Sequence, residues 1–262
     1  MPAGMPTLDD LGRDLLQVSA VRRVLCLALP FVVTALFFVF AARGWWIPAV
    51  VCTMVLSFIT YGSVSHDLVH RTLGLPVWLD DALLCAIELL TFRSGHAYRW
   101  SHLHHHARFP SDDDLEGAAA AMAWWRALID GITLQPRLWA AAMRHRGPHR
   151  RWAVFEAVAI VLLLAAASTH VASAVYSLLV IAGSWIFPFV TSYLVHDPRG
   201  GDELTQTRVF RGRLFSLVAF EHLYHLEHHL YPQVPHQRWP ELARRLDPFF
   251  ESHGLTPVRL FF

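Results

Sequence analysis

The stretch VLCLALPFVVTALFFVFAA, residues 24–42, contains no charged side chain. A helix needs about 20 predominantly apolar residues to cross the hydrocarbon core of a bilayer. The stretch is long enough to do so, and we expect a transmembrane helix here. An acidic and polar leader precedes it, so the pattern is typical of a membrane anchor rather than of a cleaved signal peptide.

Two further apolar stretches repeat this pattern. Residues 44–65 are uncharged, and residues 157–195 contain no Asp, Glu or Arg. The second stretch is too long for one helix, so we expect two spans that fold back at residues 168–173. Glu156 lies at the start of the third span, which makes this span the most polar of the four. The expected spans are residues 24–42, 44–65, 152–169 and 174–195.

The composition also indicates a membrane protein. Hydrophobic residues make up 54% of the chain and charged residues 16%, whereas soluble domains carry about 25% charged residues. The formal net charge of +1 argues against nucleic acid as a partner. The three cysteines are isolated in apolar stretches, which excludes a disulfide framework or a zinc site built on them. We expect a single all-α domain over residues 1–262.

The distribution of arginine predicts the orientation in the membrane. The 22 basic residues are all arginine, and with four spans every one except Arg43 lies on the side of the N-terminus. The positive-inside rule makes that side cytoplasmic. We therefore expect cytoplasmic termini and a cytoplasmic helical cap formed by residues 66–151 and 196–262. The absence of lysine is interpreted as coding bias, and we expect a bacterial inner membrane.

Four groups of histidines fall on the predicted cytoplasmic side. They lie in SHDLVH (65–70), WSHLHHH (100–106), SYLVHD (192–197) and EHLYHLEHHLYP (221–232). Residues at i, i+3 and i+4 of an α-helix project from one face, so each cluster can direct two or three imidazoles to one point. We expect Pro232 to end the last helix. The histidines expected to converge are His66, His70, His102, His105, His106, His196, His225, His228 and His229.

Convergent imidazoles indicate a metal site, because protonated histidines crowded on one face would repel one another. One ion takes about four to six ligands, so nine histidines predict two ions. Imidazole suits Zn, Cu, Fe and Ni, and ligand type alone does not choose among them. The protease patterns H-E-x-x-H and H-x-x-E-H are absent. The Glu-x-x-His pattern of four-helix di-iron bundles is absent as well.

Other polar residues near the clusters have two interpretations. His104 and His222 are additional ligands or partners of ligands. Carboxylates beside the ligands either accept the second N–H of a bound histidine or are ordinary solvated acids. The acidic run at residues 112–116 is predicted to be a solvated loop. The adjacent carboxylates are Asp67, Asp197, Glu221 and Glu227. The histidines interpreted as ordinary polar residues, because they lack clustered spacing, are His96, His145, His149, His170, His236 and His253.

The motifs HDLVH, HLHHH and HLEHHLYP resemble the three histidine boxes of the membrane fatty acid desaturase and hydroxylase superfamily. The boxes occur in the family order, H-x(3 or 4)-H, H-x(2 or 3)-H-H and H-x-x-H-H, over about residues 40–240, with two expected spans between the second and third boxes. The resemblance implies that the nine histidines named above are iron ligands, with His196 as the one that follows the last span. In acyl desaturases an Asn often lies four residues before that histidine, where this chain has Ser192.

The resemblance also implies the chemistry. Two non-haem irons would use O2 and two electrons from a separate donor, such as ferredoxin or cytochrome b5 with its reductase, to desaturate or hydroxylate a lipid hydrocarbon chain. A fatty acyl lipid is the first expectation. A carotenoid ring hydroxylase or ketolase is the alternative, because HHLYPQVP resembles the bacterial enzymes of that kind. A non-enzymatic metal carrier is disfavoured, since carriers place ligands near the bilayer midplane. A structural protein with degenerate boxes is disfavoured because all the box histidines are intact.

Overall fold

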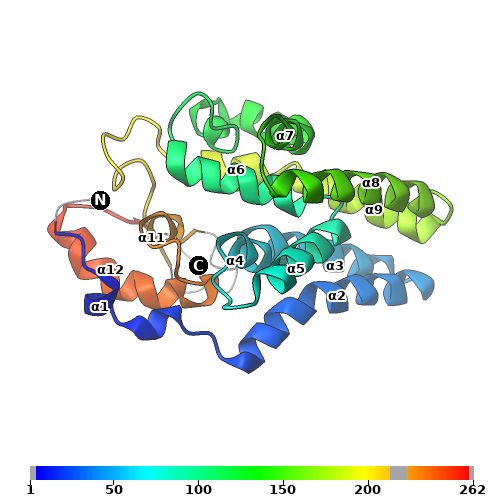
Figure 1. Cartoon of the computed structure of the whole chain (residues 1–262), viewed down its shortest axis with the longest axis horizontal. Helices are drawn as coiled ribbons and strands as arrows, with labels where there is room; N and C mark the ends of the chain where they lie inside the picture. The colour runs from blue at the N-terminus through cyan, green and yellow to red at the C-terminus, as the bar shows by residue number, and fades with distance from the viewer. Residues whose placement is uncertain (1–3, 213–222, 260–262) are drawn as a thin grey trace.

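The computed structural model describes residues 4–212 and 223–259 and is mostly helical (Figure 1). The all-α expectation holds for these residues apart from a parallel pair of two-residue strands, β1 (Phe210–Arg211) and β2 (Val258–Arg259). The helices at the four expected spans are α2 (Ala20–Ala42), α3 (Trp46–Ile59), α8 (His149–Ala167) and α9 (Val171–Ser184). The other helices are α1 (Leu8–Leu11), α4 (Ser65–His70), α5 (Val77–Leu90), α6 (Gly95–Arg108), α7 (Trp124–Arg144), α11 (His225–Leu230) and α12 (Trp239–Ser252).

Shorter helical segments link these elements. Two are π-helical, η2 (Thr60–Val64) and η4 (Pro188–Tyr193). The three that are 3₁₀-helical are η1 (Arg13–Leu16), η3 (Gly117–Ala121) and η5 (His236–Arg238).

Three helical runs in the described part of the chain are long and apolar enough to cross a membrane, namely Arg13–Ala42, Trp46–His70 and Val171–Tyr193. They correspond to the first, second and fourth expected spans. The third expected span forms α8, which includes the charged residues Arg150, Arg151 and Glu156 and is not among the three. Charges within a membrane segment are costly. The expected count of four spans is therefore not confirmed.

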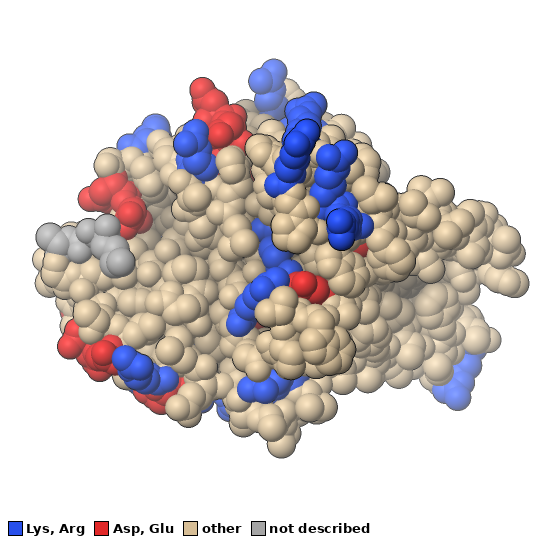
Figure 2. All heavy atoms as spheres, in the orientation of Figure 1, with Lys and Arg blue, Asp and Glu red and all other residues tan. Residues whose placement is uncertain are grey.

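The apolar helices form two hairpins, α2–α3 and α8–α9, that project from the rest of the molecule in the same direction (Figure 1). Their packing centres on Phe37, Leu56 and Tyr176, which are buried between α2, α3 and α9. One face of the hairpins is nearly free of charge, whereas basic and acidic side chains gather over the remainder of the molecule (Figure 2). This asymmetry is typical of a membrane protein whose polar part lies at one end.

Both π-helical segments directly precede histidines. The segment η2 joins α3 to α4, so one helical run carries the chain from the apolar region to His66 and His70. In η2 the Thr60 hydroxyl donates to the Leu56 carbonyl, and in η4 Pro188 lacks a backbone N–H, which removes an ordinary helical bond. Such π-bulges occur frequently at functional sites. Here each ends within three residues of a predicted ligand, His66 or His196.

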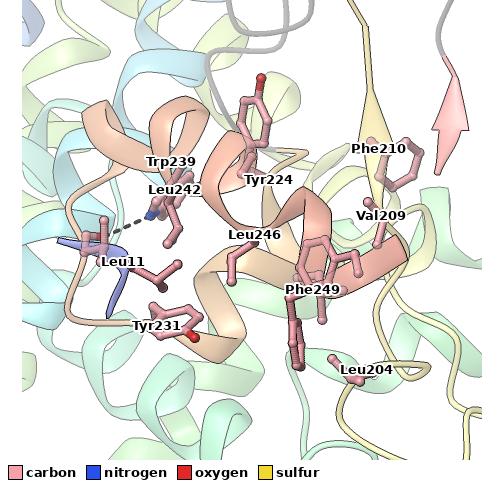
Figure 3. Close-up of a cluster of buried hydrophobic side chains, with 14 of the residues drawn as sticks. Leu11, Leu204, Val209, Phe210, Tyr224, Tyr231, Trp239, Leu242, Leu246 and Phe249 are labelled. Carbon is pink, nitrogen blue, oxygen red and sulfur yellow. Dashed lines mark hydrogen bonds between the residues drawn. The ribbon is translucent and has the colours of Figure 1, made fainter. Parts of the chain in front are cut away.

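The C-terminal helix α12 is amphipathic, and its apolar face is buried in protein. Trp239, Leu242 and Leu246 pack with Leu11 of α1 and with Leu226 of α11 (Figure 3). An amphipathic pattern requires an apolar partner without specifying membrane or protein. Helix α12 therefore braces α11, the helix that carries the last histidine cluster.

Candidate metal centre

Three helices and one loop carry the nine predicted histidines. Helices α4, α6 and α11 contain the three clusters, and His196 follows η4. Helix α6 begins at Ser94, whose hydroxyl accepts the Ala97 N–H, and α11 ends at Leu230, two residues before Pro232. The clustered histidines are therefore helical, as their spacing predicts.

The first histidine group contains five residues that converge from three helices. Its ligand atoms all lie within 4.8 Å of one another. His228 is central, because its Nε2 lies 3.0 Å from His66 Nε2 and 2.7 Å from His106 Nε2. The members of the first histidine group are His66, His70, His102, His106 and His228.

The second histidine group contains four residues and meets the same distance limit. His225 Nε2 lies 3.1 Å from both His196 Nε2 and His229 Nε2. The members are His105, His196, His225 and His229. The structure thus brings together all nine predicted histidines and divides them five and four.

The two groups interlock. Helix α6 contributes His102 and His106 to the first and His105 to the second, while α11 also contributes to both. The rings of His106 and His229, from different groups, stack with centroids 4.4 Å apart. Two ions held in this way would be close neighbours, as in a dinuclear centre.

The geometry fits metal ligation better than hydrogen bonding. With a metal–nitrogen bond of about 2.1 Å, adjacent ligand atoms are roughly 3.0 Å apart at right angles and 3.4 Å apart at a tetrahedral angle. The Nε2 pairs lie 2.7–3.3 Å apart. Two neutral imidazoles that both carry a lone pair on Nε2 cannot hydrogen-bond to each other through these atoms. Among the described residues the buried His70 Nε2 has no hydrogen-bond partner. Nitrogen donors without carboxylate ligands suit Zn, Cu, Fe or Ni rather than Mg or Ca.

Two carboxylates orient the histidines of α6. Glu116 Oε1 lies 2.7 Å from His102 Nδ1, and Asp114 Oδ2 lies 2.6 Å from His105 Nδ1. Each carboxylate can accept the Nδ1–H and leave Nε2 for a metal. Both acids are buried, so the prediction of a solvated loop at residues 112–116 is wrong for these two.

The acidic loop is held in place by its own backbone. Asp114 Oδ1 accepts the N–H groups of Glu116 and Gly117, which turns the chain back onto α6. A side chain at Gly117 would collide with Asp114 and Phe109. The local sequence offered one signal for this role, an acidic run within ten residues of the second histidine cluster.

The carboxylates predicted beside the ligands have other partners. Asp67 Oδ2 lies 2.6 Å from His236 Nδ1, so the histidine it holds is not one of the nine. Asp197 binds the backbone and side chain of Arg199 at the surface. Glu227 is buried in an ion pair with Arg211, at 2.7 Å. Among the described residues these three acids contact groups other than the nine histidines, so no contact there supports their interpretation as orienting partners.

Of the two undecided histidines, the structure describes only His104, which lies apart from the centre. His104 stacks on Trp100, with ring centroids 5.2 Å apart, and its Nε2 lies 3.4 Å from Asp113. It belongs to neither histidine group. His222 and Glu221 lie outside the described residues. Ser192 Oγ donates to the Gly117 carbonyl, so this hydroxyl supports the acidic loop.

Burial favours the neutral form of four of the predicted ligands. It lowers the pKa of His106, His196, His228 and His229 well below the ordinary value, and neighbouring imidazoles lower it further. Burial also opposes the charged form of His105, but the hydrogen bond and charge of Asp114 outweigh it and raise that pKa. Neutral imidazoles present the lone pair that a metal requires.

A small cavity adjoins the first histidine group. Its volume of about 20 Å³ is enough for roughly one water-sized molecule. The cavity is lined by His66 and His102 of the first histidine group, His225 of the second, Glu116 and the aromatic residues Tyr61, Tyr98 and Trp239. The centre therefore has room for one small molecule between histidines of both groups and three aromatic residues.

Comparison with known families agrees with this geometry. The family model described as fatty acid desaturase matches residues 43–260, a region that includes all nine histidines and both carboxylates of the acidic loop. No curated protein matches the chain.

Proposed function

The chain belongs to the fatty acid desaturase family, and we propose that it is an O2-dependent, non-haem di-iron membrane oxidase that desaturates or hydroxylates a lipid hydrocarbon chain. The observation that carries this proposal is the division of nine histidines into two interlocking groups beside apolar helices. The family supports an oxidoreductase in general. The identity of the metal, the reaction and the substrate are parts of the proposal.

We assign one iron to each histidine group. Bound iron would supply the activation of O2 and the oxidation of an unactivated C–H bond. The chain itself holds the ions through Nε2 atoms, fixes the imidazoles through Glu116 and Asp114, and surrounds the small cavity with aromatic rings. Aromatic walls limit the access of water to the reacting atoms.

Desaturation and hydroxylation both consume O2, two electrons and two protons. Desaturation combines one –CH2–CH2– unit, O2, two electrons and two protons to give –CH=CH– and two waters. Hydroxylation uses the same electrons and protons to give an alcohol and one water. A separate donor, such as ferredoxin or cytochrome b5 with its reductase, supplies the two electrons in this proposal.

The proposed topology has four spans, with α8 as the third, and the metal centre and both termini in the cytoplasm. The apolar half of α8 supports this count, because Val158, Val161 and Leu162 are exposed and would face lipid. The arginine distribution supports the orientation. A bacterial inner membrane is proposed on the same composition.

A fatty acyl lipid is the proposed substrate, and a carotenoid ring is the alternative. The test is expression in a host that makes both phospholipid and β-carotene, with His228→Ala as the inactive control. New double bonds or hydroxyls in acyl chains, absent from the control, support the proposal. New oxygen on carotenoid rings alone supports the alternative, and no change in either pool contradicts both.

A further inference from the structure

A groove opens beside the start of α2. Its volume of about 580 Å³ lies within the roughly 300–1,000 Å³ typical of ligand pockets. Leu25 and Leu29 of α2 and Ile59 of α3 form its apolar wall, and Arg22 lies at one end. The groove lies apart from the histidine groups and shares no lining residue with the small cavity beside them.

The apolar wall faces the region where lipid would lie. Leu25 and Leu29 are 63% and 43% exposed and belong to the run Arg13–Ala42, which can cross a membrane. In a bilayer such side chains contact hydrocarbon rather than water. The material that fills this part of the groove is therefore an acyl or similar hydrocarbon chain.

The charged end favours an anion. Arg22 is exposed in the first turn of α2, and among the described residues its guanidinium has no ion-pair partner. Arginine pairs with carboxylate and phosphate through two parallel hydrogen bonds. A hydrocarbon with an anionic headgroup matches both parts of the groove, whereas an uncharged carotenoid matches only the apolar part.

The groove approaches the metal centre at the end where Arg22 lies. Ser63 and His236 line it, and because α2 and α3 form a hairpin joined at residues 43–45, Ser63 lies beside the start of α2. Ser63 adjoins Gly62, which lines the small cavity, and the His236 ring is 6.3 Å from the ring of Trp239. Trp239 in turn contacts His66, at 5.2 Å between ring centroids.

Trp239 is held firmly in this position. Its indole N–H donates to the Val234 carbonyl at 2.9 Å, and it begins α12 within the apolar cluster that braces α11 (Figure 3). It also contacts His228, at 5.0 Å between centroids. The groove and the small cavity are therefore lined by neighbouring residues, Ser63 and His236 on the groove and Gly62 and Trp239 on the cavity.

We propose that this groove holds an acyl lipid whose headgroup carries a net negative charge on a carboxylate or phosphate, with Arg22 at the headgroup and the chain along Leu25 and Leu29. The binding does not rest on the proposed oxidase function, because it requires only the groove and Arg22.

Cys26 provides a reporter of binding. It lines the groove, whereas Cys52 and Cys85 are buried. A variant that keeps only Cys26, with Cys52→Ala and Cys85→Ala, is placed in phosphatidylcholine nanodiscs without iron and labelled with a membrane-permeant maleimide. Palmitate, phosphatidylglycerol and β-carotene are added separately. If Cys26 proves unreactive, Leu25→Cys in a background without native cysteines replaces it.

The proposal predicts that palmitate or phosphatidylglycerol slows labelling several-fold and that β-carotene does not. The two anionic lipids distinguish a carboxylate from a phosphate headgroup. Arg22→Gln should remove the protection, and Arg43→Gln, at the other end of α2, should retain it. Equal labelling rates with and without both anionic lipids, or protection by β-carotene alone, would overturn the proposal.

A second variant pair tests the apolar part of the groove. Leu29→Trp fills the groove, while Val39→Trp changes a residue of α2 with the same 43% exposure that does not line it. We expect the protection of Cys26 to be lost in the first and retained in the second. Oxidised lipid without Cys26 protection would refute the groove and leave the oxidase standing. Protection of Cys26 in a protein that binds no iron and forms no product would do the reverse.

Discussion

The nine-histidine centre and the environment of His96 contain the same kinds of groups in different arrangements. His96 is buried, and its Nδ1 lies 2.7 Å from Glu156 Oε1, much as His102 meets Glu116. Its ring stacks on Trp152 with centroids 4.7 Å apart. Among the described residues, however, His96 joins neither histidine group. Burial and a carboxylate partner are common to both sites, so only the convergence of Nε2 atoms distinguishes a ligand.

The largest effect should come from the histidine with the closest neighbours. His228→Ala removes the Nε2 that lies nearest to both His66 and His106. We expect loss of iron from the first histidine group and a fall in product formation beyond the about 10–100-fold typical of outer partners of a metal ligand. Metal analysis and lipid profiling measure these quantities. Full activity with a normal iron content would show that His228 is not a metal ligand.

The acidic loop should show the next largest effect. Asp114→Asn and Glu116→Gln replace the acceptors of His105 and His102, and we expect iron affinity or activity to fall about 10–100-fold. The matched control is Asp112→Asn, an exposed neighbour in the same run, which should behave as wild type. Equal behaviour of all three variants, measured by chelator titration, would mean that the loop does not orient the ligands.

The His96 environment should respond in stability rather than in metal content. Glu156→Gln disturbs the buried contacts to His96 and Ser94, and we expect a loss of about 1–3 kcal/mol in the free energy of unfolding. The iron content of the folded fraction should not change. Thermal unfolding in detergent, followed by metal analysis of the folded protein, checks both. A loss of iron at unchanged stability would place His96 within the metal centre.

The smallest effect is expected at His104. This residue lies between ligands in the sequence, but it stacks on Trp100. His104→Ala should leave iron and product unchanged and lower the free energy of unfolding by about 0.5–1.5 kcal/mol, because it removes a half-buried ring stacked on an aromatic neighbour. Depletion of iron in this variant would show that proximity in the sequence, rather than convergence of Nε2, selects the ligands.

The ligand histidines could be predicted because their spacing is local. An i, i+3, i+4 pattern fixes which imidazoles share a helix face, and α6 and α11 follow it. The division into two groups could not be predicted, because it depends on how α4, α6 and α11 cross. The pairing of Asp67 with His236 joins residues 169 positions apart, and no local pattern reports such a contact.

The remaining differences have a similar cause. The burial of Asp114 and Glu116 depends on a reversal of the chain after α6, and an acidic run has the same composition whether it is solvated or folded back. The apolar face of α12 required a partner, and tertiary packing on α1 and α11 provided it. The sequence predicts α8 as a span although it carries charged residues. In the structure α8 is not among the three described runs that are long and apolar enough to cross a membrane.

The most direct test of the central claim is the metal content of the purified, active protein, with each metal quantified per chain. Two irons per chain, removed by a chelator together with activity and restored by ferrous iron with activity, are the predicted result. An active preparation without iron, or one in which another metal alone restores activity, would contradict the assignment of the two histidine groups as a di-iron centre.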